Sequence, residues 1–282
     1  MKRAAIVVAV LGMCVGSFGQ AKPAAQSTPA AGQAAAAPQG KRMPAAKTQP
    51  EFDAFNAARQ LTDAAATEKA ADDFATKFPD SELRPMLYKA AMQRYQMANN
   101  GDKMTEMARK ALSYDADDPE ALLAVAQGLA ESTRDTDLDK DQKIAEAKKD
   151  AERALVTVDT DVPVTGAPPE QLAAFKNFLK SEAYTVLGTI AFKANNWPEA
   201  ETNLKKSIDA FPQQPDTIAV FRLAVALDMQ NKIPDAMKYA NQAVDLTKDH
   251  PDSPAGKAAR AEQDRLTKLS SGTAPGGAPP KN

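Results

Sequence analysis

Apolar residues between positions 50 and 269 recur three to four positions apart, which is the spacing of one face of an α-helix. Short breaks rich in Pro, Asn, Asp and Gly interrupt the pattern, and such residues end one helix and begin the next. The breaks fall at 78–80, 99–102, 117–119, 195–196, 211–212, 231–232 and 249–251. Because the breaks are short and the segments between them are long enough for helices, we expect antiparallel helical hairpins.

The clearest hairpin is the segment 181–212, SEAYTVLGTIAFKANNWPEAETNLKKSIDAFP. Its first helix carries Tyr184, Leu187 and Gly188 on one face, and its second helix carries Ala200 after an Asn-Asn-Trp-Pro turn. We expect the small residues to let the two helices approach closely, since a larger side chain would hold their backbones apart.

The next hairpin, 217–246, has Ala236 at the position of Ala200, which is 36 residues earlier. Less regular hairpins precede these two, and a last amphipathic helix covers 254–269. The aromatic-Leu-Gly group, the turn, the Ala and the closing Pro resemble the tetratricopeptide repeat (TPR), whose period is about 34 residues. This resemblance implies an all-α solenoid, a right-handed superhelix of about five antiparallel hairpins with a capping helix, over 50–269.

One hairpin departs from the family pattern. Its first helix begins near Pro119, but an acidic insertion, TRDTDLDKD, separates it from a second helix that is longer than usual. A Pro-rich loop follows, and the helix that begins near Glu170 runs into Tyr184, about two turns longer than the family norm. We expect these extensions to form a ridge on the solenoid.

The two ends of the chain lack the helical pattern. Lys2 and Arg3 precede an apolar run over 4–15, and small residues continue to Ala21, as in a secretory signal peptide of residues 1–21. The run is too short to span a bilayer comfortably. Residues 22–49 and 270–282 are rich in Pro, Ala, Gly and Ser, so we expect a disordered linker and a disordered tail.

The signal predicts export to the bacterial periplasm. The single Cys, Cys14, lies in the apolar run, so cleavage after Ala21 leaves a mature chain with no thiol. The sequence Leu11-Gly12-Met13-Cys14 is similar to a lipoprotein signal, although Met13 is bulkier than the residue expected there. A lipoprotein anchored in the membrane through Cys14, or a secreted protein, is therefore an alternative.

Charge and composition narrow the function. The chain has 35 Lys and Arg against 37 Asp and Glu, so no basic excess is available to neutralise the phosphates of nucleic acid. The only His, His250, lies in a Pro-flanked turn, and no marked nucleophile or Gly-rich phosphate loop accompanies it. We therefore expect neither catalysis nor a cofactor, but a protein or peptide partner and no transmembrane span in the mature chain. The oligomeric state stays open.

The resemblance also implies a binding surface, because ligands of TPR proteins commonly lie along the concave face lined by the first helix of each hairpin. Carried over position by position, this lining consists of Phe52, Phe55, Arg59, Lys89, Gln93, Gln96, Leu123, Gln127, Thr185, Thr189, Lys193, Phe221, Val225 and Met229. Its apolar ends and amide-rich centre suit an extended peptide or a partner helix. The family's carboxylate clamp needs Lys and Asn at set positions, and Lys89 is followed by Gln93 here, so we do not expect that activity.

The acidic insertion suggests a different chemistry. Oxygen ligands at alternate positions, closed by a Glu at the place of a bidentate ligand, are typical of a calcium loop: Asp135, Asp137, Asp139, Asp141 and Glu146. However, Lys140 stands where such a loop needs Gly for its sharp turn, and its charge opposes that of the ion. The other interpretation is a solvated acidic loop whose Asp residues favour the N-terminus of the next helix.

The function favoured by these features is a non-catalytic scaffold in the bacterial cell envelope that binds a peptide or a partner protein. One alternative is an envelope module that depends on calcium bound at 135–146. Another is an accessory subunit of outer-membrane assembly machinery, because the phrase ADDFxxxFPDS at 71–81 is similar to one in envelope-associated repeat proteins. A lipidated Cys14 would favour that last alternative.

Overall fold

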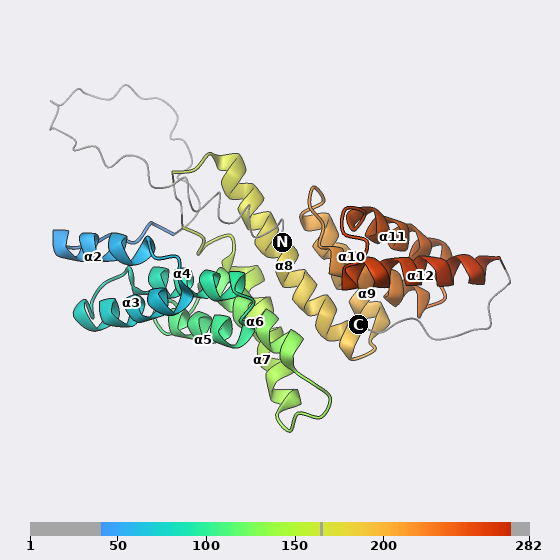
Figure 1. Ribbon diagram of the computed structural model, residues 1–282, viewed down its shortest axis with the longest axis horizontal. Helices are drawn as coiled ribbons and strands as arrows, with labels where there is room; N and C mark the ends of the chain where they lie inside the picture. The colour runs from blue at the N-terminus through green and yellow to red at the C-terminus, as the bar shows by residue number, and fades with distance from the viewer. Residues whose placement is uncertain (1–40, 164–165, 272–282) are drawn as a thin grey trace.

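The computed structural model describes residues 41–163 and 166–271 (Figure 1). Within these ranges the chain is all-helical, as expected, and has no strand beyond one isolated bridge between Lys41 and Pro163. The helices are α2 (Gln49–Arg59), α3 (Ala64–Lys77), α4 (Arg84–Met97), α5 (Gly101–Leu112), α6 (Pro119–Ser132), α7 (Lys140–Thr157), α8 (Pro169–Lys193), α9 (Trp197–Ala210), α10 (Thr217–Asp228), α11 (Ile233–Leu246) and α12 (Pro254–Ser270). The expected signal peptide, the linker up to residue 40 and the tail from 272 lie outside the described residues.

Each helix packs against the next one in the chain, from α2 through to α12. Contacts also join α2 to α4, α6 to α8, α8 to α10 and α10 to α12, so several pairs of alternate helices touch as well. Figure 1 shows α8 crossing the middle of the molecule, between α2–α7 on one side and α9–α12 on the other. No helix in the described ranges combines the length and the apolar character needed to cross a membrane.

Three of the connections share one turn geometry. Asn99, Asn195 and Asn231 follow α4, α8 and α10 with φ angles of 57°, 56° and 58°. Asn tolerates this left-handed conformation better than most residues with a side chain, and it commonly ends helices in this way. In each turn the next N–H donates to the carbonyl five residues earlier: Asn100 to Tyr95, Asn196 to Ala191, and Lys232 to Leu227, each at 2.9 Å.

The close approach expected at Gly188 is present. A Cβ atom there would lie 2.7 Å from Cγ of Leu204 and 3.2 Å from its backbone nitrogen, so α8 nearly touches the backbone of α9. Ala200, earlier on α9, is fully buried. The small residues at 188 and 200 thus hold α8 and α9 at a distance that a larger side chain would prevent.

The long helix expected near 170 is also present, since α8 covers 25 residues. Val186 and Leu187 belong to a buried cluster shared with α2–α7, and Ala191 and Phe192 belong to one shared with α9–α12. A third cluster joins Leu179 and neighbouring residues of α8 to α6 and α7. The middle helix therefore contributes to all three of these clusters.

The end of the expected linker differs from the expectation. Residues 41–48 contact the connections between helices, with Lys41 on Asp115 and Arg42 on Glu82. Pairs of opposite charges hold this segment against the helical array. The composition of the linker as a whole did not reveal these pairs.

Candidate binding surface

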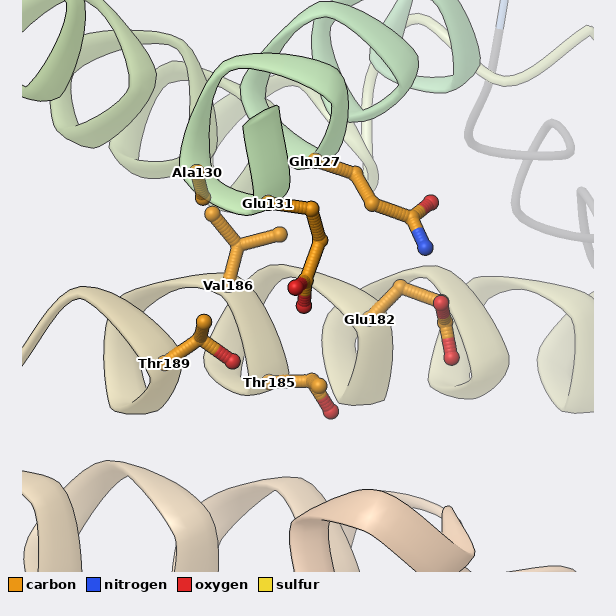
Figure 2. A pocket seen from close by; sticks show the side chains of 7 residues that line it. All are labelled: Gln127, Ala130, Glu131, Glu182, Thr185, Val186 and Thr189. Carbon is orange, nitrogen blue, oxygen red and sulfur yellow. The ribbon is translucent and has the colours of Figure 1, made fainter. Parts of the chain in front are cut away.

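A small hollow lies between α6 and α8, which carry Gln127, Thr185 and Thr189 of the expected groove lining. Figure 2 shows Glu131 pointing from α6 toward α8, with Gln127 and Glu182 to one side of it. The residues that line the hollow are Gln127, Ala130, Glu131, Glu182, Thr185, Val186 and Thr189. Most of these residues have polar side chains, and Ala130 and Val186 are the apolar ones, but the exposed wall includes apolar as well as polar surface. Such a surface offers carboxylate, amide and hydroxyl groups close to one another.

The position of α6 is set at its first turn. Asp118 accepts a hydrogen bond from the N–H of Ala121 at 2.9 Å, and Pro119 follows it at the first helical position, a combination that favours a helix start. Asp118 and Glu120 also bind Lys89 of α4 at 2.7 and 2.8 Å. Burial by itself lowers the pKa of Lys89, but the two carboxylates outweigh burial and raise it. Lys89 is thus a largely enclosed cation, with its side chain 14% exposed, that joins α4 to Asp118 and α6.

The end of α6 is bound by α8. Nζ of Lys193 donates to the carbonyl oxygens of Ala130 and Glu131 at 2.5 and 3.0 Å. These carbonyls belong to the last turn of α6, which has no helical partners for them and carries partial negative charge. Burial lowers the pKa of Lys193, and the charge of Glu131 opposes that effect.

Arg222 of α10 binds two residues that line the hollow. Its side chain is 8% exposed, and Nη1 donates to Oγ1 of Thr189 at 2.6 Å and to the carboxylate of Glu131 at 3.1 Å. One guanidinium therefore joins three helices, α6, α8 and α10. The ion pair with Arg222 holds the carboxylate of Glu131 in position. Because the side chain of Glu131 is half exposed, this carboxylate also reaches the solvent.

Hydroxyl groups fix the other side of α8. Oγ of Ser207, on α9, lies 2.7 Å from Oγ1 of Thr185 and 3.2 Å from Oγ of Ser181. Ser181 and Ser207 are both fully buried. These hydrogen bonds hold the hydroxyl of Thr185 in one orientation, toward α9 and away from α6 (Figure 2).

The structure brings together three residues of the expected groove, Gln127, Thr185 and Thr189, at this hollow. Others lie in the core and do not form an exposed lining, because their side of each first helix packs on neighbouring helices: Phe55, Leu123, Phe221 and Val225. Lys89 and Lys193 bind α6 as described above. The remaining ones are half-buried or exposed: Phe52, Arg59, Gln93, Gln96 and Met229.

Sequence reasoning missed Glu131, Glu182 and Arg222. Arg222 had a visible signal, since it is the only charged residue before Asp228 in the apolar run TIAVFRLAVALD. A cation inside such a run needs an anion nearby, which Glu131 supplies from 91 residues away in sequence. That distance hides the pair from any local pattern.

The acidic loop between α6 and α7 is organised by lysines. Asp135 binds Lys140 at 2.7 Å, and Lys143 binds Asp139 at 2.9 Å and Asp137 at 3.4 Å. Glu146, the expected bidentate ligand, instead binds Arg109 of α5. Within the described ranges, no cluster of three or more His, Cys, Asp or Glu side chains is arranged to hold a metal ion. The structure thus does not gather the five candidate ligands around one point.

Comparison with models of known protein families finds no match to this chain, and comparison with curated proteins finds none either. What the protein binds therefore has to be inferred from its own residues.

Proposed function

We propose that this protein is an exported, non-catalytic scaffold of the bacterial cell envelope, built as a TPR-like α-solenoid, which binds a protein or peptide where α6 and α8 meet. The repeat part of the proposal is supported by the shared turns at Asn99, Asn195 and Asn231. It is also supported by the close contact at Gly188. Small residues at helix crossings and a fixed turn are what stacked helical hairpins require.

The observation that carries the binding part is the hollow between α6 and α8, in which polar side chains lie beside apolar surface. Glu131 and Glu182 offer carboxylates, Gln127 offers an amide, and these groups lie beside the apolar Val186. Carboxylates accept hydrogen bonds and attract cations. The hollow therefore suits a partner that presents backbone N–H groups or a Lys or Arg side chain next to an apolar one.

The hollow is also held in shape before any partner arrives. Arg222 ties Glu131 to Thr189, and Lys193 binds the last carbonyls of α6. A surface that is already ordered loses less conformational entropy on binding, which raises affinity without any added contact.

The test is a pair of charge-matched double variants. Gln127→Lys with Glu182→Lys places two cations in the hollow, while Gln142→Lys with Glu152→Lys makes the same change on exposed positions of α7. Both are first compared with the wild type by circular dichroism. Each is then used to capture partners by cross-linking in envelope extracts of the source cells.

We expect one or a few partners to be recovered by the wild type and by the α7 variant and to be lost with the hollow variant. Recovery of the same partners by all three proteins would show that the α6–α8 face is not the contact. If all three proteins recover nothing, the scaffold proposal itself fails.

Export is tested by the mass of the mature protein. A chain that begins at Lys22 agrees with the signal peptide and with a soluble periplasmic product. A chain that begins at a lipidated Cys14 would instead place the protein on a membrane and favour a role in outer-membrane assembly. An intact residue 1 would contradict both forms of export.

A further inference from the structure

The residues 41–47, KRMPAAK, form a non-helical segment before α2 that we call the basic segment. Lys41 donates to both carboxylate oxygens of Asp115, at 2.6 and 2.8 Å, and its Nζ lies 3.8 Å from Asp161. Its backbone pairs with that of Pro163 through the isolated bridge. Lys41 therefore contacts two connections at once, the one between α5 and α6 and the one between α7 and α8 (Figure 1).

The rest of the basic segment follows the connection between α3 and α4. Arg42 binds the carboxylate of Glu82 at 2.5 Å, and Nζ of Lys47 donates to the carbonyl of Asp80 at 2.8 Å. The hydrogen bond from Arg42 lowers the pKa of Glu82, and the N–H of Ala45 acts in the same direction. All three cations of the segment thus bind oxygen atoms of helix connections.

We call these oxygen-bearing residues, Asp80, Glu82, Asp115 and Asp161, the acidic edge. Other carboxylates of the same connections have partners within the helical array, since Asp117 binds Arg153. Asp118, in turn, binds Lys89. The acidic edge differs from them because its cations come from a segment outside the helices. The partners of the edge all come from one short non-helical stretch of chain.

The contacts are of a kind that another chain can replace. The side chains of Lys41 and Arg42 are 36% and 69% exposed, so water and salt screen both ion pairs. The segment has no helix or strand of its own to lose when it leaves. Nothing in the chemistry of the acidic edge distinguishes Lys41 from a lysine of another molecule.

We propose that the acidic edge is a binding surface for extended peptide segments that carry Lys and Arg, and that residues 41–47 occupy it in this structure. The edge lies at helix connections and not between α6 and α8, so this inference does not rest on the proposed function. Because the occupant is covalently attached, its effective concentration is in the millimolar range, and a partner segment must compete with it.

The first test asks whether the basic segment is held by the acidic edge. Trypsin cleaves after Lys and Arg, so it reports on the accessibility of residues 41 and 42. In the full chain, Asp115→Asn with Asp161→Asn is expected to speed cleavage there by about threefold or more, since both carboxylates that face Lys41 are neutralised. The matched control is Asp209→Asn with Asp245→Asn, at exposed positions of α9 and α11. Equal cleavage of the two variants would overturn the proposal.

The second test asks whether the edge accepts a segment from another molecule. The probe is a fluorescent peptide with the sequence of residues 41–48, and a peptide with Glu at its three basic positions is the control. Binding is measured by anisotropy to the wild type and to a full-chain variant with Lys41→Ala, Arg42→Ala and Lys47→Ala. We expect the basic peptide to bind this variant at least about tenfold more tightly, because the attached competitor is weakened.

Adding Asp115→Asn and Asp161→Asn to the triple variant is expected to abolish this binding, while Gln127→Lys with Glu182→Lys leaves it unchanged. Equal affinity for the wild type and the triple variant would overturn the proposal. So would binding that survives the Asp substitutions, equal binding of the Glu peptide, or no binding at all. Loss of binding through the α6–α8 substitutions alone would move the site to the hollow and away from the edge.

Discussion

The pair α8 and α9 and the pair α6 and α7 are both consecutive helices of one array, but they are joined in different ways. Between α8 and α9 the chain turns at Asn195, and Gly188 brings the backbones together. Between α6 and α7 it passes through residues 133–139, whose Asp side chains bind Lys140 and Lys143 at the surface. Leu138, at 108% relative exposure, lies in the solvent.

The difference shows two ways of fixing a connection. Packed backbones and a left-handed turn residue depend on shape, which salt does not change. Exposed ion pairs depend on charge, which salt screens, and each contributes little to stability. We therefore expect substitutions in α8 and α9 to act on the whole fold, and substitutions in 133–139 to act locally.

The largest effect is expected for Gly188→Ala. The added Cβ would meet the side chain of Leu204 and its backbone nitrogen, so movement of one side chain cannot relieve the clash. We expect the free energy of unfolding, measured with urea, to fall by about 2–3 kcal/mol. Gly101→Ala is the control, since nothing lies within 4 Å of its new Cβ and the change should be neutral or slightly stabilising. Equal effects at the two positions would contradict the close approach of α8 and α9.

A smaller effect, dependent on pH, is expected for Glu201→Gln. Burial raises the pKa of Glu201, but Lys205, Lys232 and Gln230 outweigh it and lower the pKa to about 2. A carboxylate with a lowered pKa in the folded state stabilises above its unfolded value of 4.5 and loses this effect as the pH falls toward 2. The variant should be about 2 kcal/mol less stable than the wild type at pH 7, and the gap should close in acid.

Chemical denaturation at several pH values measures this gap. Glu152→Gln, on the exposed face of α7, serves as the control, and its difference from the wild type should stay small throughout. If the stability difference between Glu201→Gln and the wild type does not change between pH 7 and pH 3, the ion pairs of Glu201 with Lys205 and Lys232 do not stabilise the fold as we expect.

The next effect concerns the turn at Asn195. Asn195→Ala places a residue with a less favourable left-handed conformation at φ 56°, so we expect a loss of about 1 kcal/mol in unfolding free energy. Asn195→Gly should be neutral or slightly stabilising, because Gly adopts this conformation freely. Parallel pairs at Asn99 and Asn231 should give the same order. An Ala variant as stable as the Gly variant would show that the turn is not constrained.

The smallest effect is expected in the loop 133–139. Lys143→Ala removes the cation that binds Asp137 and Asp139, and the melting temperature should change by less than about 2 °C. Added calcium should leave it unchanged in the wild type, because lysines already accompany the acidic residues. A calcium-dependent rise that disappears in Asp137→Asn would instead support the calcium alternative.

Much of the architecture was predictable because it depends on local residues. The breaks at Asn195 and Asn231 marked turns, and the small residue at 188 marked a helix crossing. Capping chemistry and periodicity act over a few residues, so they can be read directly from the chain. The long helix that includes Tyr184 could be predicted for the same reason.

The surface was less predictable because it depends on how helices face one another. Phe221 and Leu123 fit the family's groove positions, yet the packing of α10 and α6 buries them. The partners of Arg222 and of Lys41 lie 91 and 74 residues away in sequence, beyond the range of any periodic pattern. Of these two long-range contacts, only the one made by Arg222 could be suspected from neighbouring residues, because Arg222 is a charged residue inside an apolar run.

The sharing of α8 among three buried clusters has a mechanical consequence. Among the buried clusters, α8 is the helix that connects the first helices to the last ones, and the ion pairs Arg222–Glu131 and Lys148–Glu199 join the two sides beside it. We therefore expect that a displacement of α8 relative to α6 would also change its packing against α9–α12, because α8 contributes to clusters on both sides.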